Sequence, residues 1–106
     1  MYFLVIEKAV TPAPHPNLRE RMKIVTAHYD YYNELQKQGK VLHYSWVGTP
    51  GGVNIFNVKD NNELDILIAN GPRFRFCTYE IAPLMTLEDA RKVAGQLKEK
   101  ADREGT

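Results

Sequence analysis

The segment VLHYSWVGTPGGVNIFNV, residues 41–58, decides the fold of this chain. Two runs rich in β-branched and aromatic residues, 41–47 and 53–58, flank the turn-forming sequence TPGG, and this arrangement predicts a β-hairpin. The two strands also carry an imidazole, phenol, hydroxyl, indole and amide groups beside apolar side chains. Such a mixture is typical of the wall of a small-molecule pocket.

The sequence before the hairpin predicts a strand and then a long helix. Residues 2–8 are apolar enough for the strand, and three prolines within residues 11–16 exclude regular structure after it. Asn17 offers an N-cap for the helix, which we expect to run to about Gln38. Gly39 is then a natural residue for the helix C-terminus.

The sequence after the hairpin predicts a helix, a strand and a final helix. Asp60 starts the first of these helices, which ends at residues 71–72, a Gly-Pro pair. We expect the fourth strand over residues 74–81, closed by Pro83. Thr86 opens the last helix. One apolar stripe runs along this helix, formed by Leu87, Ala90, Val93, Ala94 and Leu97.

The resulting order, β-α-β-β-α-β plus a C-terminal helix, is that of the ferredoxin-like, split β-α-β arrangement. We therefore predict one α+β domain over residues 1–106, with a four-stranded antiparallel sheet and helices on one of its faces. The strands carry more apolar side chains than one face uses. We expect a second copy to cover the other face, which predicts a homodimer or higher homo-oligomer.

Composition narrows the class of partner. The chain is 43% hydrophobic and 25% charged, with a net charge of +1, so it has no electrostatic footprint for nucleic acid or a membrane. Cys77 is the only cysteine, which excludes an internal disulfide and fits a reducing compartment. No stretch resembles a signal peptide or reaches the length of a membrane span. We expect a cytoplasmic protein whose partner is a small molecule.

The first helix carries a histidine in an apolar environment. Its apolar arc consists of Ile24, Val25, Tyr29, Tyr31, Tyr32 and Leu35. His28 falls near the middle of this arc, so it should point inward, close to Arg21 and Tyr32. One interpretation is a buried histidine satisfied by a hydrogen bond. The other is a pocket histidine that exchanges a proton near neutral pH.

The second histidine of interest lies on the hairpin. Alternation places His43 on the same strand face as Val41, Ser45 and Val47, and it places Trp46 on the opposite face. The sequence does not fix which face meets the helices. His43 is therefore either a pocket residue or an interface residue.

Three charged residues near the fourth strand are further candidates. Glu80 shares a predicted face with Phe74 and Phe76, so its pKa would rise on burial and suit a general base or acid. The alternative is an exposed charge at the strand end. Arg73 and Arg75 fall on one face by alternation, where they either hold a substrate carboxylate or remain solvated.

The third histidine and the possible metal ligands suggest no further site. His15 lies among prolines, and we expect it to be exposed and without a role. His28 and His43 have no third ligand at a spacing typical of metal sites, so we expect no metal.

The central and C-terminal part of the chain resembles the muconolactone isomerase family. The resemblance rests on Leu35 to Gly39 at the helix end, His43, Trp46 and Gly48, Asn54 to Val58, Leu64 and Leu67, Pro72 and Phe74, and Glu80 to Leu84. It covers roughly residues 29–84, or more loosely the chain from residue 1. Residues 11–16, His28 and the tyrosine-rich stretch at 29–32 depart from the family pattern.

The resemblance implies a dimeric α+β barrel that shifts a double bond in a small lactone by proton transfer, without a cofactor or metal. Glu80, His43, Trp46 and Asn54 fall on positions that match the family. Such chemistry needs one base of tuned pKa, groups that stabilise an enolate-like intermediate, and a dry pocket.

Our leading hypothesis is thus an isomerase-like enzyme acting on a small, anionic, oxygenated ring compound. The predicted roles are His28 or Glu80 as the base, Tyr32, His43 and Asn54 on the substrate oxygen, Trp46 as a wall and Arg75 on a carboxylate. The main alternative is a non-catalytic binding or accessory protein of the same fold. The chain also resembles YciI-like proteins through His28 and Gly39, and cofactor-free monooxygenases of this barrel type are a third option.

Overall fold

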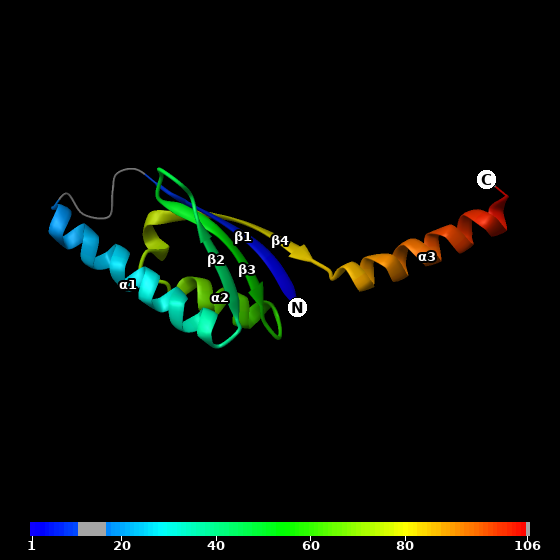
Figure 1. Ribbon diagram of the computed structural model, residues 1–106, viewed down its shortest axis with the longest axis horizontal. Coiled ribbons are helices and arrows are strands. Elements are labelled where there is room, and N and C mark those ends of the chain that lie inside the picture. The colour runs from blue at the N-terminus through cyan, green and yellow to red at the C-terminus, as the bar shows by residue number, and fades with distance from the viewer. Residues whose placement is uncertain (11–16, 106) are drawn as a thin grey trace.

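The computed structural model describes residues 1–10 and 17–105, and the element order is the predicted one (Figure 1). The elements are β1 (Tyr2–Ala9), α1 (Leu18–Lys37), β2 (Val41–Ser45), β3 (Gly51–Asn57), α2 (Asn61–Ala69), the 3-10 turn η1 (Phe74–Phe76), β4 (Cys77–Leu84) and α3 (Leu87–Glu104). The predicted irregular segment at 11–16, with His15, lies outside the described residues.

The four strands form one antiparallel sheet in the order β2-β3-β1-β4, and α1 and α2 pack on one of its faces (Figure 1). The predicted α+β, ferredoxin-like fold is therefore confirmed. In β1, Phe3, Val5 and Glu7 point toward the helices and are buried, whereas the residues between them face the other way. We call these two sides of the sheet the covered face and the open face.

The core lies between the covered face and the two helices. It consists of Phe3, Val5, Tyr32, Leu35, Val41, Phe56, Val58, Leu64 and Ile68. Polar side chains are buried in the same layer, namely Glu7, His28, Asn54 and Arg73. Charged side chains are rarely buried unless they are paired, so the contacts of this group are a candidate for a functional site.

The predicted helix starts and the predicted end of α1 are confirmed by the capping contacts, whereas α2 ends at Ala69, before the predicted residues 71–72. The side chain of Asn17 accepts a hydrogen bond from the backbone N–H of Glu20, and Gly39 adopts a φ of 75° after the last turn of α1. Asp60 and Thr86 cap α2 and α3 in the same way as Asn17. Local sequence therefore determines where all three helices begin.

The fourth strand begins later than the sequence predicted. Phe74–Phe76 form a 3-10 turn, in which the N–H of Phe76 donates to the carbonyl of Arg73, and β4 starts only at Cys77. Because the chain turns here, Arg73 and Arg75 do not share a strand face. Pro83 lies inside β4, which an edge strand tolerates because the missing N–H faces no neighbouring strand.

The hairpin connection lies earlier in the chain than predicted, because β2 ends at Ser45 and Gly51 and Gly52 belong to β3. A Cβ atom on Gly51 would lie 2.3 Å from the carbonyl oxygen of Glu7, and one on Gly52 would lie 2.3 Å from that of Tyr44. Gly51 also has a φ of 112°, a conformation that side-chain-bearing residues rarely adopt. These glycines serve close strand contacts and not only a turn.

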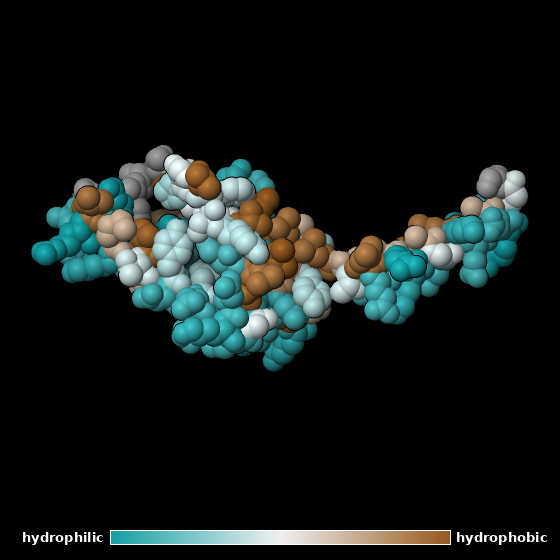
Figure 2. All heavy atoms as spheres, in the orientation of Figure 1, coloured by the Kyte–Doolittle hydropathy of each residue, from teal (hydrophilic) through white to brown (hydrophobic). Residues whose placement is uncertain are grey.

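Two apolar surfaces are not covered by any of the described residues. Helix α3 projects from the body, and none of its residues is buried (Figure 1). The open face carries Leu4, Ile6, Leu42, Tyr44, Val53, Ile55 and Leu84. Figure 2 shows apolar atoms over the strands beside the base of α3 and along one side of this helix. None of the described helices combines the length and apolar character needed to span a membrane.

Candidate active site

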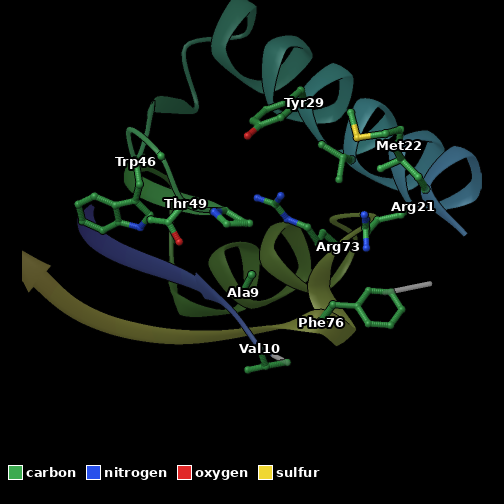
Figure 3. Close-up of a pocket in the computed structure, with 13 residues that line it drawn as sticks. Ala9, Val10, Arg21, Met22, Tyr29, Trp46, Thr49, Arg73 and Phe76 are labelled. Atoms are coloured by element: carbon green, nitrogen blue, oxygen red, sulfur yellow. The ribbon is translucent and has the colours of Figure 1, made fainter. Parts of the chain in front are cut away.

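A pocket of about 650 Å³ opens between the first half of α1, the connection from β2 to β3, and η1 (Figure 3). Most of its wall is apolar or aromatic, formed by Val10, Met22, Val25, Tyr29, Trp46 and Phe76. Its charged lining residues are Arg21 and Arg73. A concave site with apolar walls and a few convergent polar groups suits a small ring compound that bears a negative charge.

Arg73 is the polar centre of this pocket. Only 2% of the residue is exposed, and its guanidinium carbon lies 5.7 Å from the ring centroid of Tyr29. Figure 3 shows the guanidinium extending between Tyr29 and Trp46. The turn η1 directs Arg73 inward and leaves Arg75, two residues later, exposed. The residue expected to hold a carboxylate, Arg75, is therefore not brought to the pocket, and its neighbour Arg73 is.

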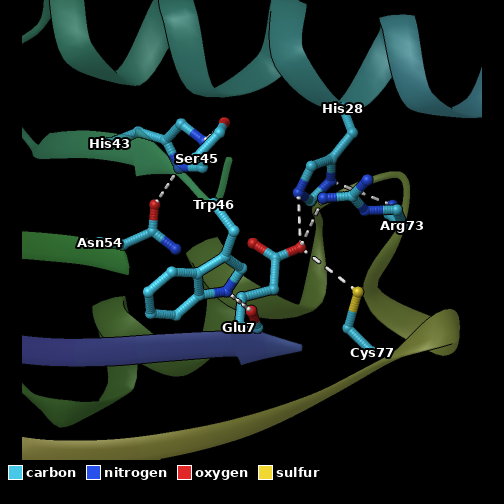
Figure 4. A network of polar contacts seen from close by, with 8 residues as sticks. All are labelled: Glu7, His28, His43, Ser45, Trp46, Asn54, Arg73 and Cys77. Carbon is cyan, nitrogen blue, oxygen red and sulfur yellow. Dashed lines mark hydrogen bonds and ion pairs between the residues drawn. The ribbon is translucent and has the colours of Figure 1, made fainter. Parts of the chain in front are cut away.

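Behind Arg73 lies a buried carboxylate with three partners (Figure 4). Oε1 of Glu7 lies 2.9 Å from Nε2 of His28 and 3.4 Å from a terminal nitrogen of Arg73. The thiol of Cys77 donates to the same oxygen at 3.3 Å. The other oxygen, Oε2, is buried and has no hydrogen-bond partner among the described residues.

One hydrogen bond indicates the tautomer of His28. The backbone N–H of Arg73 donates to Nδ1 at 3.1 Å, so the neutral ring carries its proton on Nε2, which faces Glu7. The side chain is fully buried. His28 thus points inward as predicted, but protein groups contact both of its nitrogens.

The contacts within this cluster shift the pKa values of Glu7, Arg73 and Cys77. Burial by itself raises the pKa of Glu7, but the contacts with His28 and Arg73 outweigh burial and lower this pKa to about 2. Burial tends to lower the pKa of Arg73, and the Glu7 carboxylate more than compensates, so this pKa is raised. Burial and the Glu7 charge raise the pKa of Cys77 to about 11, which keeps the thiol protonated as a donor.

A second group of polar contacts lies on the hairpin, on the other side of Trp46 (Figure 4). It consists of His43, Asn54 and Ser45, and we call it the relay. Nδ1 of His43 lies 2.5 Å from Oδ1 of Asn54, and Nε2 lies 2.8 Å from the hydroxyl of Ser45. An amide oxygen only accepts, so Nδ1 of His43 carries the proton and Nε2 has the free lone pair. An imidazole oriented through one nitrogen, with the other near an exposed hydroxyl, has the geometry of a general base.

His43 and Tyr32 are not among the residues that line the pocket, but their rings pack beside it. The ring of Tyr29, which lines the pocket, lies 5.9 Å from that of His43, and the ring of Tyr32 lies 5.4 Å from it. The buried hydroxyl of Tyr32 has no partner among the described residues, and burial with the nearby Glu7 charge raises its pKa. Trp46 donates from Nε1 to the carbonyl of Glu7 at 3.1 Å, which fixes the indole as a wall.

The strand faces that the sequence left open are now defined. His43 and Asn54 lie opposite each other on the covered face, so His43 faces the helices. Trp46 follows the last residue of β2 and turns to the same side, although alternation had placed it on the other. Glu80 pairs with Ile6 on the open face and is exposed, so the structure does not bring it together with His28.

The sequence left Glu7, like Glu80, as either a buried acid or base or an exposed charge at a strand end, and the structure shows it buried. Its partners could not be predicted, because Arg73 and Cys77 lie 66 and 70 residues away. Ser45 was likewise visible only as a neighbour of His43. Within residues 1–10 and 17–105, no group of three His, Cys, Asp or Glu side chains is arranged to hold a metal ion.

Comparisons with known proteins point to one family. The family model described as muconolactone delta-isomerase matches residues 1–90. The structure is similar to that of muconolactone isomerase, with a TM-score of 0.72 and 17% identity over 81% of this chain and 90% of that one. It is also similar to 5-chloro-2-hydroxyhydroquinone dehydrochlorinase from Burkholderia phenoliruptrix in complex with 2,5-dihydroxybenzoquinone, with a TM-score of 0.65 and 18% identity over 84% of this chain and 98% of that one. At these identities the likeness shows the fold. A search of curated proteins finds no match.

Proposed function

The chain belongs to the muconolactone delta-isomerase family, and from this premise we propose that it is a cofactor-free isomerase- or lyase-like enzyme. Its reaction moves a proton on a small, anionic, oxygenated ring compound. The observation that carries the proposal is the oriented imidazole of His43 beside an apolar pocket that contains the buried cation of Arg73. We further propose that the protein acts in the cytoplasm, in keeping with its single, protonated thiol.

Substrate binding uses the two kinds of pocket wall. A flat ring stacks between Tyr29 and Trp46, where it excludes water from the reacting carbon. The substrate carboxylate pairs with Arg73, because a desolvated guanidinium is a strong and geometrically specific partner for this group. Arg21 also lines the pocket, is less buried than Arg73, and favours entry of an anion.

Proton transfer is assigned to His43. Nε2 takes the proton from a carbon next to the substrate carbonyl and returns it to another carbon, while the oxygen of Asn54 holds the imidazole in the reactive tautomer. Ser45 rotates its hydroxyl away to free Nε2. Tyr32, which is buried and does not line the pocket, packs against the imidazole and helps to hold its orientation.

The two bases expected from the sequence have other positions in this proposal. His28 contacts the protein through both nitrogens and is fully buried, so it holds the pocket floor and does not accept the substrate proton. Glu80 lies on the open face, away from the pocket, and its carboxylate is exposed there. The proposal therefore moves the base to His43, which the sequence had assigned to substrate binding.

The proposed active form is a homodimer or a higher homo-oligomer. The open face and the α3 stripe are two apolar surfaces that residues 1–10 and 17–105 leave uncovered, and both belong to every copy. Two copies related by a twofold axis can cover these surfaces reciprocally. Leu42, Leu97 and Leu84 expose 50%, 61% and 41% of their surface, which such an interface would remove from water.

The proposal is tested by following solvent deuterium into candidate substrates. The protein is incubated in D2O with a chelator and without cofactors, together with muconolactone, simple unsaturated lactone acids and 2,5-dihydroxybenzoquinone. Proton NMR should reveal exchange or rearrangement of at least one compound at a rate proportional to enzyme concentration. Binding without any exchange across this panel would instead favour the non-catalytic binding protein.

A further inference from the structure

We infer that Glu7 is a positioning residue whose buried carboxylate fixes the guanidinium of Arg73 toward the pocket. The inference rests on the proposed function in one respect, namely that Arg73 binds the negative group of the substrate. Glu7 is fully buried and its Oε1 contacts only His28, Arg73 and Cys77 among the described residues, so it acts through Arg73 and is not a catalytic residue.

The contacts of Arg73 are what make Glu7 necessary. The guanidinium is attached to a turn of three residues, and its side chain is only 3% exposed. Glu7 provides the ion pair at 3.4 Å, whereas Nε of Arg73 has no partner among the described residues. The ring of Tyr29 contacts the guanidinium without fixing its rotation. Glu7 is therefore the group that selects one orientation of a long, flexible side chain.

Glu7 is in turn rigidly held. Its Oε1 meets His28 and Cys77 as well as Arg73, and its backbone carbonyl accepts from the indole of Trp46. His28 is anchored a second time through the backbone N–H of Arg73. The carboxylate thus links β1, α1 and the turn before β4, three segments that border the pocket (Figure 4).

The space around the cluster also favours positioning over proton transfer. A Cβ atom on Gly71 would lie 3.2 Å from Cε1 of His28, so the ring is tightly enclosed. The carboxylate and the guanidinium carry opposite charges, which lets the pair stay buried without another counter-ion. Removing the carboxylate therefore frees Arg73 and leaves its charge unpaired.

The test measures ligand binding with the single tryptophan as the reporter. Trp46 lines the pocket, so its fluorescence should change when a ring compound binds. Benzoate serves as the anionic probe and benzamide as its uncharged analogue. The proteins compared are wild type, Glu7→Gln, Arg73→Met and the double variant, with Glu34→Gln as a control that removes an exposed carboxylate of α1.

The inference predicts a specific pattern of affinities. Glu7→Gln should weaken benzoate binding about tenfold, the change expected when a charge-assisted contact loses its geometry, and leave benzamide binding within about twofold. In the Arg73→Met background the same substitution should have no further effect on benzoate, because Glu7 acts only through Arg73. Wild-type benzoate affinity in Glu7→Gln would overturn the inference.

A second measurement needs no ligand and separates this inference from the proposed function. In wild type, the Nε–H signal of Arg73, identified by its loss in Arg73→Lys, should be resolved in nitrogen-edited NMR spectra because the guanidinium is fixed and buried. In Glu7→Gln it should broaden or exchange with water. An unchanged signal would overturn the positioning role. Absence of benzoate binding to wild type, with the expected NMR result, would count against Arg73 as the substrate anchor and leave its positioning by Glu7 established.

Discussion

At the scale of single residues, one backbone turn determines which of Arg73 and Arg75 is buried. Both arginines flank Phe74, and a continuous strand would have put them on one face. The 3-10 turn instead buries Arg73 to 2% exposure and leaves Arg75 in solvent. The chemistry expected of this pair, recognition of a carboxylate, thus falls to only one of them.

Because only Arg73 is buried at the pocket, lysine variants of the two arginines should differ in their affinity for an anionic ring compound. Arg73→Lys should reduce affinity for an anionic ring compound about tenfold or more, because an ammonium cannot reproduce the planar guanidinium contacts. Arg75→Lys should change it less than about twofold. Titrations of benzoate monitored by Trp46 fluorescence measure both. Equal losses for the two variants would mean that the pocket does not use Arg73 in particular.

His43 is the residue on which the proposed chemistry depends most. His43→Gln keeps a polar side chain of similar size but removes the titratable nitrogen, so turnover should fall by about 10²-fold or more. Asn54→Ala should have a smaller effect of the same kind, since it releases the tautomer without removing the base. Steady-state rates of the deuterium exchange, with circular dichroism to verify folding, provide the measurement. Full activity of His43→Gln would require a different base.

The ionisation of Glu7 should make the free energy of unfolding depend on pH. Its pKa is about 2 in the folded protein against an ordinary value of 4.5, so the folded state is favoured whenever the carboxylate is ionised. This contribution, roughly 3 kcal/mol at about 1.4 kcal/mol per pKa unit, is complete above pH 4.5 and is lost as the pH falls toward 2. In urea unfolding, the stability difference between wild type and Glu7→Gln should therefore be largest at neutral pH and shrink below pH 4.5. A difference that grows on acidification would contradict this sign.

At the scale of elements, the sequence predicted most of what depends on neighbouring residues. Asn17, Asp60 and Thr86 cap their helices as expected, because an N-cap is a contact over three residues. The hairpin and the inward orientation of His28 followed from period and composition. The polar cluster did not, because contacts across 66 residues depend on strand register and on the turn before β4.

The hairpin offers a test at this scale. A Cβ on Gly52 would lie 2.3 Å from the carbonyl oxygen of Tyr44 and 3.0 Å from Cε1 of His43, so Gly52→Ala should destabilise the β2–β3 pair and displace His43. We expect a loss of about 1–3 kcal/mol in unfolding free energy together with reduced turnover. Gly95→Ala is the matched control, because nothing lies within 4 Å of its added Cβ in α3. That variant should be neutral or slightly more stable.

The whole molecule is elongated, with extents of 66 × 27 × 23 Å, because α3 stands away from the body. An exposed helix with one apolar stripe gains little stability by itself, so its packing partner is expected on a second copy. The same copy accounts for the apolar open face. Shape and composition thus agree with the proposed assembly at the largest scale.

Charge placed in the stripe should disrupt this assembly. Val93→Glu combined with Leu97→Glu puts two carboxylates in the proposed interface and should shift the protein from a dimer or larger oligomer toward the monomer. Glu99→Lys, on the opposite side of the helix, should leave the assembly unchanged. Size-exclusion chromatography with light scattering reports the mass of each. A monomeric wild type at micromolar concentration would contradict the proposal.

The most direct test of the central claim is a crystal structure of the protein with muconolactone or another compound that exchanges deuterium. The account predicts that the ring lies between Tyr29 and Trp46, that its carboxylate pairs with Arg73, and that a reacting carbon lies about 3–3.5 Å from Nε2 of His43. A ligand bound on the open face beside Glu80, or one in the pocket with no carbon near His43, would contradict it.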